Sequence, residues 1–151
     1  MRYTRFIPVL ALAVTAAACN KDRQNEAGGD VAPGAGTATA TTALRVTDVE
    51  LGRAVGADKR VTDATDNFNA TDVVYASVHT SGSASNATLM ARWTFEDGQV
   101  VDESTQTIAP TGDAVTEFHI SKPGGLPKGK YKVEVFVNGT SVESEEFTVG
   151  G

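Results

Sequence analysis

Apolar and polar residues alternate most regularly near the C-terminal end of the chain, on either side of an Asn-Gly pair. From Tyr131 to Val137 every second residue is apolar, which is the period of a strand with one buried face. Asn138-Gly139 follows and favours a two-residue hairpin turn, because a type I′ turn needs positive φ at both central residues. The pattern predicts a β-hairpin within Leu126 to Val149.

The return strand of this hairpin contains a change of parity. Val142 and Phe147 cannot face the same side of one regular strand. One extra residue near Ser144-Glu145 would place Phe147 opposite Tyr131, because a bulge shifts every later side chain to the other face. We therefore expect a β-bulge at Ser144-Glu145.

Further strands are expected upstream of the hairpin. The same alternation and the intervening turn residues place them over residues 44–51, 72–80, 87–95, 100–108 and 114–120, with a short edge strand over 59–62. In the first of them Val46 and Val49 have opposite parity, so a bulge near Thr47-Asp48 is expected. The bulky set that includes Trp93 and Phe95 is expected to face the core, and the polar strand over 100–108 to lie at a sheet edge.

The first 18 residues have the three parts of a secretion signal. Arg2 and Arg5 supply a basic start, and residues 6–18 form an apolar run that is too short for a membrane-spanning helix of about 20 residues. The run ends on Ala16-Ala17-Ala18, small residues that a signal peptidase requires. Cys19 follows and is the only cysteine. An exported protein with one cysteine needs a separate explanation for it.

Small residues directly before a cysteine resemble the bacterial lipobox, although Ala16 stands where that motif usually has Leu. The resemblance implies that Cys19 carries fatty-acyl chains such as palmitate and becomes the new N-terminus, so that the protein is anchored to a membrane. Ordinary cleavage before Cys19, which leaves a free thiol, is the alternative. Asn20 is not the Asp that retains enterobacterial lipoproteins at the inner membrane, so we expect the outer membrane, with the protein facing the periplasm.

Residues 20–43 separate this end from the folded part. They contain charged residues followed by Gly, Ala, Thr and Pro, with no aromatic residue, so they cannot bury enough apolar area to offset the entropy of ordering. We therefore expect a signal peptide over 1–18, the lipidated Cys19 and a flexible tether over 19–43, and one folded domain over 44–151. The formal net charge of −6, which becomes more negative without the signal peptide, argues against a nucleic-acid partner.

About seven short strands, frequent turns and no amphipathic helix beyond the tether predict an all-β, antiparallel β-sandwich. Trp93 on the third main strand resembles the tryptophan of the immunoglobulin fold. The segment from Leu126 to Tyr131 resembles the tyrosine corner of fibronectin III-type domains, in which the tyrosine hydroxyl caps upstream backbone. The layout as a whole resembles small bacterial lipoproteins that carry one immunoglobulin-like module, a fold that does not by itself fix a function.

Candidate chemistry in the sequence is sparse. His79 and His119 are the only histidines, and the alternation places both on outward faces. Two histidines and a carboxylate can bind zinc or copper. No HxH, HxxxH or CxxC spacing supports such a site, so we predict surface histidines, no metal and no cofactor. Ser77 and Ser121 lie outside any G-x-S-x-G elbow, which argues against a serine hydrolase.

Acidic residues offer two further alternatives. Calcium prefers clustered oxygen ligands, and a loop that lacks the Asp-x-Asp-x-Asp-Gly pattern holds four candidates: Asp58, Asp63, Asp66 and Asp72. We expect Asp72, at the entry to a strand, to accept hydrogen bonds from loop amides instead. Carboxylate pairs at 96–97 and 102–103 flank a turn and a polar strand, where solvated charges are expected rather than a glycosidase pair.

The remaining candidate is a partner-binding face on the sheet that contains the third main strand and the hairpin. Its expected members are Met90, Arg92, Lys130, Lys132 and Phe136. An exposed Phe and Met among long charged side chains indicate a modest recognition surface, with an ordinary mixed sheet surface as the alternative. We therefore expect a lipid-anchored envelope protein whose module binds another envelope protein or a glycan. A small-ligand or metal-binding periplasmic module is the second interpretation, and a hydrolase the third.

Overall fold

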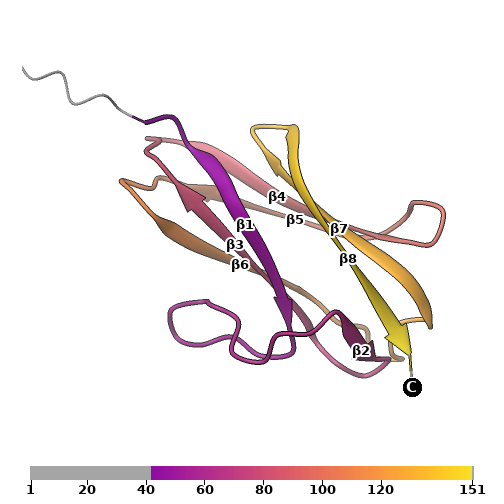
Figure 1. The fold of residues 1–151 in the computed structure, drawn as a ribbon. Coiled ribbons are helices and arrows are strands. Elements are labelled where there is room, and N and C mark those ends of the chain that lie inside the picture. Colours follow the sequence, from indigo (N-terminus) through magenta and orange to yellow (C-terminus); the bar gives the residue numbers. More distant parts are fainter. Residues whose placement is uncertain (1–41, 151) are drawn as a thin grey trace, which may run out of the picture. The chain divides into compact units, whose positions relative to one another are not determined.

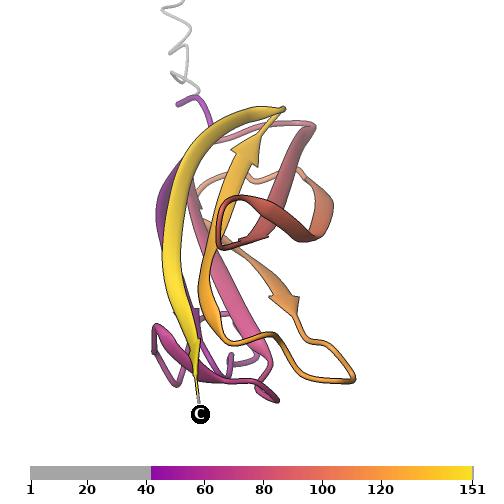
Figure 2. The same ribbon diagram turned by 90° about the vertical axis from the view of Figure 1, so that its right-hand side faces the viewer.

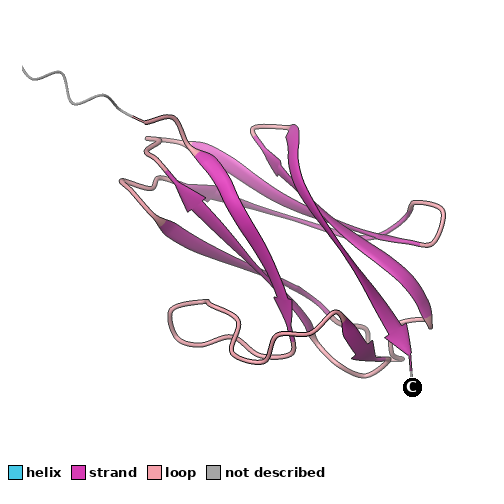
Figure 3. Ribbon diagram, in the orientation of Figure 1, coloured by secondary structure: helices cyan, strands magenta, loops and turns pink. Residues whose placement is uncertain are grey.

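The computed structural model describes residues 42–150, so the expected signal peptide, Cys19 and nearly all of the tether lie outside the described residues. The described part contains strands and loops and no helix (Figure 3). Accordingly, nothing between residues 42 and 150 has the length and apolarity of a membrane-crossing helix. In chain order the strands are β1 (Arg45–Gly52), β2 (Asn67–Asn69), β3 (Val74–Ser81), β4 (Ala87–Phe95), β5 (Gln99–Ile108), β6 (Ala114–Ile120), β7 (Gly129–Val137) and β8 (Thr140–Gly150).

The strands form two sheets, one with the order β1-β3-β6 and the other with the order β2-β8-β7-β4-β5. All pairs are antiparallel except β2 with the end of β8. Strands of both sheets run in similar directions in two perpendicular views (Figures 1 and 2). The order β1-β3-β6 corresponds to strands A-B-E of immunoglobulin-type sandwiches and the order β8-β7-β4-β5 to strands G-F-C-C′, with the short β2 added beside β8. The predicted immunoglobulin-like β-sandwich is thus confirmed, with β5 at one edge of its sheet as expected.

The core lies between the two sheets, and the predicted alternation accounts for it. Trp93 is fully buried, with its ring edge-on to Phe147 at a centroid distance of 5.9 Å. Phe147 in turn stacks on Tyr131 at 5.1 Å. The Tyr131 hydroxyl donates to the carbonyl of Pro127 at 2.7 Å, which confirms the predicted tyrosine corner. The hairpin turn is also as predicted, because Asn138 and Gly139 both have positive φ.

One predicted bulge is confirmed and the other is misplaced. In β1, Val46 pairs with Thr80 and Asp48 with His79, so Thr47 is the extra residue. In β8 the shift falls at Val142 and not at Ser144-Glu145.

The register of the hairpin gives the reason for this difference. Phe136 pairs with Ser141 and Val135 with Glu143, while Tyr131 still pairs with Phe147. Val142 is the extra residue, and 43% of its surface is exposed. Glu143 then shares the inner face with Val135, but it stays exposed because β2 pairs only with the last three residues of β8 and leaves this rim open.

The expected edge strand over 59–62 does not form, since Val61 makes only an isolated bridge to Val55. Residues 53–66 instead fold as a loop that lies against β3. The Ser77 hydroxyl donates to the carbonyl of Lys59 at 2.5 Å, and Ser77 is fully buried although the alternation places it on the outer face. A loop therefore covers part of the outer face of this sheet.

Candidate functional site

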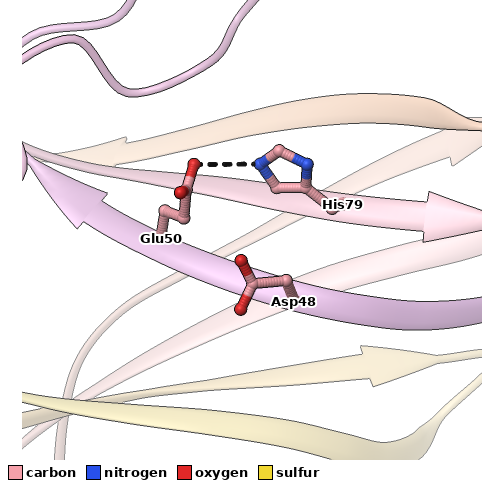
Figure 4. A group of neighbouring side chains, drawn as sticks. All are labelled: Asp48, Glu50 and His79. Carbon is pink, nitrogen blue, oxygen red and sulfur yellow. Dashed lines mark hydrogen bonds and ion pairs between the residues drawn. The ribbon is translucent and has the colours of Figure 1, made fainter.

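Three side chains of metal-ligand type meet on the outer face of the three-stranded sheet, as Figure 4 shows: Asp48 and Glu50 from β1 and His79 from β3. One ligand atom from each lies within 4.8 Å of the other two. Glu50 Oε2 is 3.1 Å from His79 Nε2. Between residues 42 and 150 no other group of three such side chains comes this close together.

The bulge at Thr47 builds this cluster. Val49 and Leu51 point into the core, so Asp48 and Glu50 point outward. Because Thr47 is passed over in the pairing, Asp48 lies directly opposite His79 and its side chain is a cross-strand neighbour of the imidazole. β-Bulges commonly re-aim side chains next to functional sites.

His79 is held on both ring nitrogens. Its side chain is 15% exposed, and Arg60 Nη1 lies 3.4 Å from its Nδ1. Arginine has only donors, so Nδ1 accepts this hydrogen bond and the ring proton sits on Nε2, from which it is donated to Glu50. Arg60 is itself more than half exposed, and its Nε lies 3.6 Å from an oxygen of Asp58.

A shallow hollow of about 430 Å³ adjoins the cluster on the Arg60 side. Its lining includes Thr47, Asp58, Arg60, His79 and Asp113. The imidazole of His79 is therefore reached from solvent through a polar opening between the loop and the sheet.

Asp48 adds to the negative charge around Glu145 on β8. Burial raises the pKa of Glu145, and repulsion from Glu143 and Asp48 raises it further. Carboxylates that lie near one another create a negative potential, which attracts a cation.

The two histidines lie in different settings. His119, on the exposed face of β6, has its Nδ1 2.6 Å from Glu117 Oε1, and its ring lies 5.5 Å from that of Tyr75. His119 and His79 share no ligand group, so a site that combines both histidines is not formed by the described residues.

The four aspartates of the expected calcium alternative do not converge either. Asp58 pairs with Arg60 and Asp63 with Arg53. Asp72 accepts from Arg53 Nε at 2.9 Å and from the Asn69 amide at 2.8 Å, as expected for a residue that fixes a loop. These hydrogen bonds, that of the Asn69 amide first, hold the pKa of the Asp72 carboxyl below its usual value.

The expected partner-binding face is assembled, but its aromatic residue is covered. Met90 pairs with Phe136 across β4 and β7. The Arg92 guanidinium lies over the Phe136 ring at 4.8 Å and bonds Glu103 at 2.8 Å. Phe136 is therefore only 9% exposed, and the expectation of an exposed Phe is wrong because the Arg92 side chain shields it.

The two lysines of this face lie beside a second hollow. Lys130 and Lys132 border a depression of about 360 Å³ together with Glu96 and Glu146. Lys132 Nζ is 4.0 Å from Glu134 Oε2, a surface ion pair of little energetic weight. The five predicted residues thus lie along β4 and β7. The Arg92 guanidinium covers Phe136 at one end, and Lys130 and Lys132 lie at the other.

The sequence did not predict the cluster of Asp48, Glu50 and His79. His79 is 29 residues from Glu50 and 31 from Asp48, and only the pairing of β1 with β3 brings it to them. The signal that could have found it was the parity change at Thr47, combined with the assumption that the first and third strands are neighbours.

Comparisons with known proteins show no family for this chain. No family model matches the chain, and no curated protein matches it. Among solved structures, an immunoglobulin-like protein from Pseudomonas aeruginosa is 18% identical with a TM-score of 0.48, and the match covers 74% of this chain and 99% of that one. The CARDB domain of a Pyrococcus furiosus protein, in complex with di-metal ions, is 15% identical with a TM-score of 0.43, covering 72% of this chain and 86% of that one.

Other matches are to much longer proteins. An alkylpurine DNA glycosylase from Pseudomonas fluorescens is 14% identical with a TM-score of 0.48, covering 72% of this chain but only 30% of the glycosylase. A β-glucosidase from Listeria innocua also matches, but the match covers only 16% of the β-glucosidase chain. At these identities and TM-scores the matches carry no argument about what this chain binds or catalyses.

Proposed function

We propose that this chain is a lipid-anchored protein of the bacterial cell envelope whose sandwich binds another envelope protein without catalysing a reaction. The observation that carries the proposal is the position of Cys19, the only cysteine, directly after Ala16-Ala17-Ala18 and an apolar run, and ahead of a tether and a folded domain. The lipid would hold the domain at the outer membrane, facing the periplasm. Multiple acyl chains make such an anchor stable.

The use of the polar side chains in the sandwich supports a binding role. Asp72 fixes the loop through Arg53, and the buried Ser77 holds the carbonyl of Lys59. Arg92, Lys130 and Lys132 remain accessible and lie along one face of the five-stranded sheet. Extended sheet faces suit the recognition of a macromolecule.

The surface proposed to make this contact is the Arg92 face, which consists of Met90, Arg92, Lys130, Lys132 and Phe136. Arg92 is already held over Phe136 and by Glu103, so little side-chain entropy remains to be lost when a partner binds. Arginine and aromatic residues are enriched among the residues that dominate binding energies. The neighbouring lysines favour a partner surface that carries carboxylates; a glycan is the alternative occupant.

The anchor is tested by metabolic labelling with an alkyne analogue of palmitate. The wild-type chain should incorporate the label and fractionate with outer membranes, and Cys19→Ser should lose both properties. Because Cys19 is expected in the tether and not in the folded domain, the variant should retain the thermal unfolding of the wild type. A wild-type chain that is secreted without label, with a free thiol at Cys19, would contradict the anchor.

The binding face is tested by photocrosslinking in intact envelopes. A photoreactive amino acid at Met90, half-buried on the Arg92 face, should give a discrete protein adduct. The same residue at His119, on the outer face of the other sheet, is the matched control and should not. Arg92→Ala should weaken the adduct at Met90. Equal adducts at both positions, or adducts to glycan alone, would rule out an envelope protein as the partner of this face.

A further inference from the structure

We propose that Asp48, Glu50 and His79 form a binding site for a divalent transition ion of the zinc type. This inference is independent of the proposed lipid anchor and of the Arg92 face, since it rests on a different sheet. It is carried by the convergence of one imidazole nitrogen and two carboxylates within 4.8 Å, produced by a bulge that turns Asp48 toward His79.

The donor set selects the class of ion. Imidazole nitrogen is a ligand for zinc and for neighbouring transition metals, and Asp and Glu oxygens complete many such sites. Calcium instead takes six to eight oxygens, which this cluster cannot supply, and magnesium retains its water and prefers oxygen. One nitrogen and two oxygens leave a fourth tetrahedral position for water, which solvent can reach from the hollow beside Arg60.

The geometry requires only side-chain adjustment. Bonds of about 2.0–2.2 Å in a tetrahedral site place ligand atoms about 3.4 Å apart. The Glu50 and His79 atoms are already 3.1 Å apart, and Asp48 and Glu50 are exposed side chains that can rotate toward the imidazole. The backbone beneath them is a ladder of seven paired positions between β1 and β3, so the three Cα positions are fixed.

Binding requires one proton to move. In the metal-free site Nε2 carries the ring proton and Nδ1 accepts from Arg60. For Nε2 to donate its lone pair to the ion, that proton leaves to solvent while Nδ1 takes one up, so the imidazole stays neutral and no net proton is released from it. Arg60 would then face this new N–H with its own N–H, so its side chain must move away from the imidazole. The side chain is exposed and already lies near Asp58, with which it can pair.

Local charge favours the cation. Glu145 on β8 lies near Asp48 and is repelled by it, and a positive ion held by Asp48 would offset this repulsion. The guanidinium of Arg60 opposes the ion, so removing it should strengthen binding. Stronger binding on removal of Arg60, in contrast to weaker binding on removal of a ligand, distinguishes a defined site at His79 from diffuse attraction to an acidic surface.

The test is calorimetric titration of the full chain with zinc chloride. All preparations carry Cys19→Ser, so that the thiol does not compete, and are kept in a non-ionic detergent. We expect one ion per chain, and no comparable heat with calcium or magnesium. Removing a ligand should weaken binding at least about tenfold, because even residues that only hydrogen-bond to a metal ligand contribute about 10–100-fold to metal affinity.

The variants separate a ligand role from a folding role. Glu50→Gln and Asp48→Asn preserve side-chain size at exposed positions, and both should weaken zinc binding while leaving thermal unfolding of the metal-free chain unchanged. His79→Ala should abolish binding. Arg60→Gln should strengthen it. The matched control is His119→Ala, which removes the other histidine and leaves the three proposed ligands in place, and it should bind like the parent.

Either of two results would overturn the proposal. One is the absence of zinc binding by a folded parent chain at millimolar zinc. The other is binding that Glu50→Gln and Asp48→Asn leave unchanged or that His119→Ala removes, since the ion would then sit elsewhere on the acidic surface.

Discussion

Replacing Tyr131 with Phe isolates one hydrogen bond in the core of the sandwich. The substitution removes the hydroxyl that donates to Pro127 at 2.7 Å and keeps the ring. The ring contacts, with Phe147 at 5.1 Å and Phe95 at 4.8 Å, remain available to Phe. The change therefore affects the attachment of the loop before β7 rather than the packing beneath it.

The expected loss follows from what happens to the partner atom. A neutral intramolecular hydrogen bond contributes a net of about 1 kcal/mol, and an acceptor left buried and unpaired costs up to about 3 kcal/mol. Pro127 is exposed, so water can reach its carbonyl after the substitution. We therefore expect a loss of about 1 kcal/mol in the free energy of unfolding, which is about 4–8 °C in Tm for a domain near 100 residues.

Urea unfolding followed by the fluorescence of Trp93, the only tryptophan, measures this loss. The matched control is Tyr75→Phe, a half-buried tyrosine on the outer face of β3, for which we expect a change below about 0.5 kcal/mol. Equal small changes in both variants would refute the reasoning, because the corner hydroxyl would then contribute nothing. A loss above about 3 kcal/mol would also refute it, because the Pro127 carbonyl would then not be hydrated.

Three further outcomes are expected. Burial, and secondarily the charge of Glu96, raises the pKa of Tyr131. The stability that this phenol contributes is therefore fully present below about pH 10 and is lost as the pH rises through its folded pKa. In spectrophotometric titration, Tyr131→Phe should remove the late-ionising tyrosine. Hydrogen bonds from Asn69 and Arg53 lower the pKa of Asp72, so the stability that its carboxylate contributes is present above about pH 4 and is lost as the pH falls through the lower folded pKa. Asp72→Asn should therefore be less stable than wild type at pH 7, and the difference in the free energy of unfolding should narrow as the pH is lowered. A difference that stays constant with pH would contradict this. Gly129→Ala should lower Tm by more than Gly124→Ala. Gly129 has φ 149°, and a Cβ added there would overlap Glu96 and lie 2.7 Å from the Phe95 ring, whereas nothing lies within 4 Å of a Cβ added at Gly124. Equal Tm values for the two variants would refute the clash.

Alternation alone predicted most of the sandwich, because a strand with one buried face shows its inner residues directly. Trp93, Phe118 and Val133 are buried as that pattern requires. The alternation did not determine the position of the bulge in β8. Any single extra residue between Ser141 and Phe147 restores the pairing of Phe147 with Tyr131, so parity fixes the number of bulges and not their place.

The candidate site was less accessible to sequence reasoning because it depends on contacts between distant segments. His79 lies within reach of Glu50 only when β1 pairs with β3, and no local pattern states which strands are neighbours. Ser77 was expected outside for a related reason, since the loop that covers it has no strand or helix period of its own. Phe136 was expected to be exposed because the alternation says nothing about a long side chain such as Arg92 lying over a neighbouring ring.

The two margins of the five-stranded sheet bear on how crowded copies would behave. One margin, β5, carries Asp102 and Glu103, and the open length of β8 carries Glu143 and Glu145 around the exposed Val142. Acidic side chains and an interrupted ladder both discourage a second molecule from adding its own strand. Lipid anchoring would concentrate many copies in one plane, and under that condition these margins would keep neighbouring sandwiches from fusing into a continuous sheet.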